Sequence, residues 1–219
     1  MGSTVLLAVV LVLNIGAGDG PIALTGTDST AAPQSTGPPS AAQEIPPPDL
    51  QGFPTAPAPD ELATVALPDT VSAVTALFEQ LPAAVAGHTR LPQIDRVSPE
   101  RLSVGYGEDR RISGGSTALL WLLAIDLTRG DFFPPNWTGG QVVAYMARQA
   151  VEAGRDGSLF WVRNETSMNV PGSAEQFLVY GMLWGRVDSS WMFSVQADTR
   201  ESRDALLTAF VAAAKSAGR

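Results

Sequence analysis

The stretch FLVYGMLWGRVDSSWMFSVQA at residues 177–197 decides the fold class. Two runs rich in aromatic and aliphatic residues, 177–187 and 191–197, flank the polar connection Asp188-Ser189-Ser190. Such a pattern is typical of a β-hairpin, in which two strands pair antiparallel across a short loop. The sequence therefore predicts a sheet with antiparallel strands toward the C-terminal end of the chain.

Side chains alternate between the two faces of a strand, so the hairpin also predicts what each face carries. We expect the core face, under a C-terminal helix, to hold Val179, Leu183, Val187, Trp191, Phe193 and Val195. We expect the opposite face to hold Tyr180, Met182, Trp184, Arg186, Met192, Ser194 and Gln196. The mixed character of this second face indicates a ligand-binding surface, a homodimer patch or a surface covered by another helix, and the sequence leaves the three open.

Outward from the hairpin, the hydrophobic periodicity predicts five strands and three helices in all. Strands are expected at 102–106, 116–128, 159–163, 177–187 and 191–197. Helices are expected at 70–80, 139–153 and 199–217, with caps at Asp69, Thr138 and Asp198 and an end at Gly218. The order α-β-β-α-β-β-β-α predicts an α+β fold with a largely antiparallel sheet of about five strands.

The composition divides the chain near residue 66. Eleven of the seventeen prolines lie in residues 1–70, and fifteen of the sixteen aromatic residues lie in residues 66–219. A segment rich in Pro, Gly, Ala, Ser and Thr buries too little apolar surface to offset its chain entropy. We therefore expect a disordered Pro-rich linker at 19–65 and a single α+β domain at 66–219.

The first residues indicate export from the cytoplasm. Residues 5–13, VLLAVVLVL, form an unbroken apolar run, followed by small residues at 16–18. A run of this length suits a signal peptide better than a complete membrane span, although no Lys or Arg precedes it. We expect a signal peptide or an N-terminal membrane anchor at 1–18, hence an exported protein that is secreted or tethered to the membrane. Membrane contact is expected only through this segment.

Charge and residue content exclude several functions. The chain has no cysteine, a single histidine and a formal net charge of −8, and no basic stripe that would bind a phosphate backbone. Nucleic-acid binding is therefore not expected, and neither is a cofactor or metal site. One route to catalysis stays open, a hydrolase that uses carboxylates, with Asp126 at the end of the most apolar strand and His88 as the only imidazole.

A loop with three large aromatic residues provides a second candidate for binding. In the sequence GDFFPPNW at 130–137, a Pro-Pro pair separates Phe132 and Phe133 from Trp137. These rings are expected either to contact a partner or to fold back as a plug beneath the following helix. Our first hypothesis is an exported, non-catalytic binding module of the cell envelope, whose partner is an envelope protein or a small-molecule ligand; the alternative is the hydrolase. The oligomeric state stays open.

Overall fold

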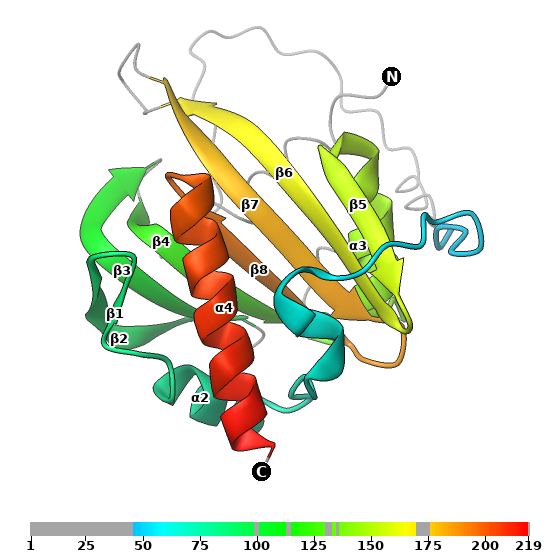
Figure 1. Ribbon diagram of the computed structural model, residues 1–219, viewed down its shortest axis with the longest axis horizontal. Coiled ribbons are helices and arrows are strands. Elements are labelled where there is room, and N and C mark those ends of the chain that lie inside the picture. Colours follow the sequence, from blue (N-terminus) through cyan, green and yellow to red (C-terminus); the bar gives the residue numbers. More distant parts are fainter. Residues whose placement is uncertain are drawn as a thin grey trace, which may run out of the picture.

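The computed structural model describes residues 46–98, 101–112, 115–129, 133–134, 136–169 and 176–218. These residues form one eight-stranded antiparallel sheet with helices on both of its faces (Figure 1). The α+β class and the antiparallel sheet are confirmed, whereas the expected number of five strands is too small. The segment expected as a signal peptide or anchor at 1–18, and the linker up to residue 45, lie outside the described residues.

Two four-stranded meanders build the sheet. The strands are β1 (Ala84–Val85), β2 (His88–Ser98), β3 (Arg101–Ile112), β4 (Gly115–Asp126), β5 (Glu152–Asp156), β6 (Leu159–Asn169), β7 (Gln176–Arg186) and β8 (Trp191–Ala197). Their order across the sheet is β1-β2-β3-β4-β8-β7-β6-β5, so the last strands of the two meanders, β4 and β8, pair in the middle. Each meander is followed by a helix, which packs back onto the sheet.

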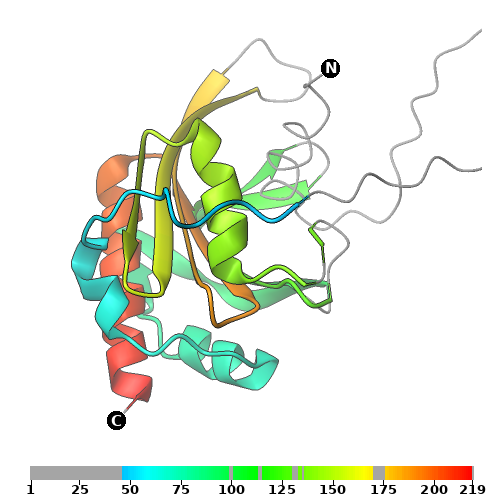
Figure 2. The same cartoon turned by 90° about the vertical axis from the view of Figure 1, so that its right-hand side faces the viewer.

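Helices cover the two faces of the sheet unequally. The helical segments are η1 (Pro59–Thr64), α2 (Val71–Glu79), α3 (Gly139–Met146), η2 (Ala147–Gln149) and α4 (Arg200–Ala217). Helix α4 crosses one face together with α2 and η1, and α3 lies on the opposite face against β6, β7 and β8 (Figures 1 and 2). We call these two sides the α4 face and the α3 face. Within the described residues, no helix combines the length and apolar character needed to cross a membrane.

An aromatic cluster forms the centre of the core on the α4 face. The ring of Trp184 stacks on Phe193 with centroids 5.8 Å apart, and Phe210 of α4 meets Trp184 edge-on at 5.2 Å. All three side chains have no exposed surface. Full burial of one such side chain contributes roughly 1.5–3 kcal/mol, so this contact holds α4 on the sheet.

The start of α3 shows how closely a helix approaches the other face. Thr138 accepts a hydrogen bond from the backbone N–H of Gln141, and the Gln141 side chain accepts one from Thr138, as the expected cap requires. A Cβ atom on Gly139 would lie 2.1 Å from the carbonyl oxygen of Trp191, and one on Gly185 would lie 2.5 Å from the Gly139 backbone. These two glycines therefore set the distance between helix and sheet.

Three strands of the sheet were not predicted from the sequence. The first two, β1 and β2, meet at Ala86 and Gly87, whose φ angles of 50° and 80° are those of a tight hairpin turn. Strand β2 then contains Pro92 where its register with β3 shifts, a bulge that tolerates the missing N–H. The third, β5, begins within the helix expected at 139–153, because that helix ends at Met146.

Two of the expected helix caps are wrong by one residue. The N-cap residues of α2 and α4 are Thr70 and Thr199 rather than Asp69 and Asp198. In each case the threonine hydroxyl accepts a hydrogen bond from a backbone N–H three residues later, that of Ala73 or Ser202. A threonine and an aspartate side by side can both cap a helix, so the pattern located each start only to within one residue.

The predicted faces of the hairpin are half right. Trp191, Phe193 and Val195 lie on the α4 face as expected, but Met182 and Trp184 lie beside them there, not on the opposite face. The expectation paired residue 187 with 191, whereas the last pair of the hairpin is Gly185 with Met192. This slip of one residue in register moves every side chain of the first strand to the other face.

A segment at residues 50–65, which we call the strap, belongs to the folded domain. Leu50 and Phe53 pack on the α3 face, where the ring of Phe53 lies 5.0 Å from that of Phe160. Further along, Leu62 and Val65 are buried on the α4 face. The strap thus passes from one face to the other around β5, and the domain begins before residue 66, where the sequence placed its boundary.

The strap also covers the edge of the sheet. Its Ala56 N–H donates to the carbonyl of Arg155 at 3.0 Å, and the N–H of Arg155 donates to the Pro54 carbonyl at 2.8 Å. This parallel pairing extends no further, because Pro54 has no N–H and the Ala58 N–H binds the Asp156 carboxylate. A short, proline-terminated segment of this kind protects an edge strand from pairing with another chain.

Candidate functional site

The structure removes two predicted binding residues from any surface. Met182 and Trp184 have no exposed surface and belong to the core beneath α4. Their size and character first suggested a ligand-binding face, but the corrected register turns them inward. They stabilise the domain as part of its core.

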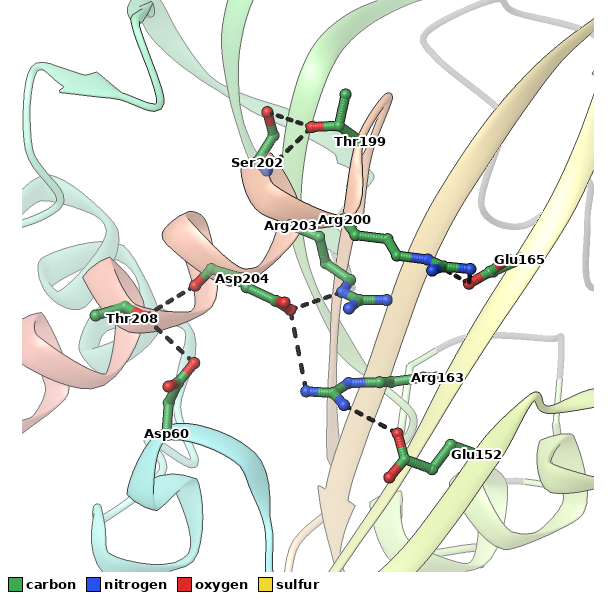
Figure 3. A network of polar contacts seen from close by, with 10 residues as sticks. All are labelled: Asp60, Glu152, Arg163, Glu165, Thr199, Arg200, Ser202, Arg203, Asp204 and Thr208. Atoms are coloured by element: carbon green, nitrogen blue, oxygen red, sulfur yellow. Dashed lines mark hydrogen bonds and ion pairs between the residues drawn. The ribbon is translucent and has the colours of Figure 1, made fainter.

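Tyr180 of β7 contacts Arg200 at the start of α4, and Arg200 belongs to the network of paired charges that Figure 3 shows. Its ring is 5.5 Å from the guanidinium of Arg200, which binds Glu165 at 2.7 Å. Nearby, Arg163 of β6 binds Glu152 at 2.9 Å and comes within 4.0 Å of Asp204. Each of these arginines has a carboxylate partner, so the network fastens α4 to β6.

Arg186 has a structural partner on each side. Its guanidinium donates to the carbonyl oxygens of Ala63 and Val65 at 3.1 and 3.0 Å, and to the Ser158 hydroxyl at 3.0 Å. Because both carbonyls belong to the strap, Arg186 anchors the strap to the sheet. Its predicted binding role has no support in these contacts.

The aromatic loop folds back toward the domain as far as the structure describes it. Trp137 is buried beside α3, with Phe133 stacked on it at 6.2 Å and Tyr145 edge-on at 5.4 Å. Trp137 precedes the cap residue Thr138, which is the position of a hydrophobic staple. Phe132 lies outside the described residues.

The two residues considered for catalysis are far apart in the sheet. His88 begins β2, two residues before Arg90, which is level with Tyr106 and Leu120. Asp126 ends β4 six residues beyond Leu120, or about 20 Å at the usual rise of a strand. Asp126 binds the N–H and hydroxyl of Thr128 at 3.1 and 2.7 Å, as in an ordinary turn. No group of three His, Asp or Glu residues in the described part of the chain is arranged to hold a metal ion.

A polar surface that the sequence did not single out lies on the α3 face. Strand register places five residues side by side across β3, β4, β8, β7 and β6, in the order Gly105, Trp121, Gln196, Gly181 and Asn164. Neighbours in such a row have Cβ positions about 4.5–5.5 Å apart. The row therefore combines an indole and two amide side chains with two glycines.

A second row lies directly beside it, nearer to α3. It runs from Ser103 through Leu123 and Ser194 to Leu183. Ser194 is 1% exposed, and its hydroxyl has no hydrogen-bond partner in the structure. Buried hydroxyl groups in native proteins are nearly always hydrogen-bonded, so an unpaired one requires an explanation.

Asn164 provides a second unpaired atom in the same region. Its Oδ1 is buried without a partner, and a Cβ atom on Gly181 would lie 2.0 Å from it. The amide of Asn164 thus occupies the space above Gly181, where any other residue would displace it. We call the set Ser103, Trp121, Asn164, Gly181, Ser194 and Gln196 the polar patch.

The residues of the polar patch differ in how far their side chains are exposed to solvent. Ser103, Trp121 and Ser194 are buried, whereas Gln196 and Asn164 are half-buried. Arg101 lies at the buried end with its guanidinium 5.5 Å from the centre of the Trp121 ring. The patch is therefore reached from the side of β6 and β8 that carries the two amides.

Comparison with known proteins does not assign the chain to a family. Neither a family model, a curated protein nor a solved structure matches the chain. The evidence for function therefore comes from the arrangement of its own residues. Ser194 and Gln196 were already expected opposite the core face of the hairpin. Trp121 and Asn164 come from other strands, and only the register between strands, which the sequence does not reveal, places them beside Gln196 and Gly181.

Proposed function

We propose that this domain is a non-catalytic binding module that holds a small polar molecule on the polar patch. The main support is that two buried polar atoms on one face of the sheet, Ser194 Oγ and Asn164 Oδ1, have no hydrogen-bond partner. Leaving such an atom unpaired costs about 1–3 kcal/mol. A bound molecule that hydrogen-bonds to both atoms removes this cost.

The chemistry of the patch favours binding over reaction. It offers an aromatic ring, two amides and two hydroxyl groups, which is the usual lining of a site that orients a ligand. The six residues that define the patch include no imidazole or carboxylate that could act as a base for Ser194. The site is therefore suited to recognition.

The N-terminal sequence supports a place outside the cytoplasm. The apolar run at residues 5–13 and the Pro-rich segment after it are typical of an exported chain on a tether. We propose that the module acts in the cell envelope and that its ligand is met there. This part of the proposal rests on composition alone.

A retention experiment tests the binding function. The purified full chain is incubated with a small-molecule extract of its native host, washed, and analysed by native mass spectrometry. We expect the wild type to retain a compound that Ser194→Ala loses. The matched control Ser216→Ala removes an exposed hydroxyl of α4 and should retain the compound. If the wild type retains nothing, or if both variants retain the same compound equally, the polar patch is not a binding site.

A further inference from the structure

The unpaired atoms of the polar patch also indicate the chemical class of its ligand, if the proposed binding function holds. Asn164 Oδ1 accepts hydrogen bonds and cannot donate them, whereas the Ser194 hydroxyl can do both. A third acceptor, Oδ1 of Asp198, is likewise buried without a partner directly after the end of β8. Two of these three atoms therefore need a donor.

This requirement excludes one common class of ligand. A carboxylate group offers only acceptors, so it could not satisfy Asn164 or Asp198, and a phosphate group has only its few P–OH groups to donate. The negative charge of Asp198 would also repel it. Arg101 lies at the other end of the patch, two residues along β3 from Ser103, and is packed on Trp121.

We propose that the ligand is an uncharged polyhydroxylated molecule, such as a sugar. Its hydroxyl groups donate to Asn164 Oδ1 and Asp198 Oδ1, and one of them exchanges a hydrogen bond with Ser194. The half-buried Gln196 amide, level with Asn164 across Gly181, adds one donor pair and one acceptor at the rim. Gly105, at the other end of the row, carries no side chain that would keep a ring-shaped molecule from the backbone.

The test follows the patch directly in solution. The full chain is labelled with ¹⁵N, and the side-chain NH₂ signals of Asn164 and Gln196 and the indole signal of Trp121 are recorded by NMR. Three probes are added separately: D-glucose, inorganic phosphate and the diamine putrescine. We expect glucose to shift the three signals in a saturable manner and phosphate to leave them unchanged.

Two variants separate the alternatives. Ser194→Ala should weaken glucose binding about fivefold or more, the effect of losing one buried hydrogen bond, whereas Ser216→Ala should not. Asn164→Asp keeps the acceptor oxygen and adds negative charge, so it should retain glucose binding.

The outcomes distinguish this inference from the binding function itself. Saturable shifts with phosphate or putrescine but not with glucose would overturn the hydroxyl assignment and leave the binding module standing. The absence of shifts with all three probes would also overturn the hydroxyl assignment. In that case the retention experiment with the host extract still decides, independently, whether the patch binds any molecule.

Discussion

Replacing Ser194 by alanine should make the ligand-free protein more stable. The side chain is 1% exposed and its hydroxyl has no partner, so the folded state bears the cost of removing that group from water. Such a cost is about 1–3 kcal/mol. Loss of one oxygen atom also removes some packing contacts with the row neighbours Leu123 and Leu183. The expected net gain in the free energy of unfolding is about 1 kcal/mol.

Urea denaturation of the full chain, followed by tryptophan fluorescence, measures this gain. For a domain of this size, about 1 kcal/mol corresponds to a rise in Tm of roughly 2–4 °C. Ser216→Ala is the matched control, since its exposed hydroxyl donates to the Ala212 carbonyl within α4 and its loss should change stability by less than about 0.5 kcal/mol. A loss of about 1 kcal/mol or more in Ser194→Ala would show that the hydroxyl is already hydrogen-bonded in solution, for example to an ordered water, and would refute the reasoning.

Three further changes test the fold around the site. Tyr106→Phe removes the hydrogen bond to the Pro82 carbonyl and should cost about 1 kcal/mol at neutral pH. Burial raises the pKa of Tyr106 despite the nearby Arg90, so the wild type should lose stability as the pH rises above about 10 and through that raised pKa. The variant should lack this loss in denaturation curves recorded at pH 8–11. Gly185→Ala should separate α3 from the sheet and lower stability by about 2 kcal/mol or more, and an unchanged Tm would contradict the close approach to Gly139. Arg186→Met should cost about 2 kcal/mol and increase hydrogen exchange of the strap first, whereas uniform exchange would show that Arg186 does not anchor it.

The sequence predicted the elements whose pattern depends on local physics. The C-terminal helix, the helix capped by Thr138 and the long apolar strand β4 were all expected, because each has an uninterrupted periodicity and a cap or turn nearby. The α+β class followed from the hairpin. These features depend on residues within one turn or one strand of each other.

The missed elements depend on contacts that are distant in sequence. The strap looks like linker because prolines dominate it, yet Leu62 and Phe53 find partners on α4 and on Phe160. Strand β2 contains a proline that a bulge accommodates. Beyond the last β6–β7 pair, the N–H of Val187 still donates to the Ser158 carbonyl, so the end of β7 follows β6, which is distant in sequence.

The same dependence on register explains why the candidate site was displaced. The large aromatic residues of the hairpin led to the prediction of a binding face, but in a folded domain such residues most often fill the core, as Trp184 does. The polar patch is visible only when Trp121, Asn164 and Ser194 are brought together from three strands. An apolar residue at position 194 would serve the fold at least as well, because its neighbours in the row, Leu123 and Leu183, are already apolar. A buried hydroxyl at a position where the fold gains nothing from it is the strongest reason to search for a ligand there.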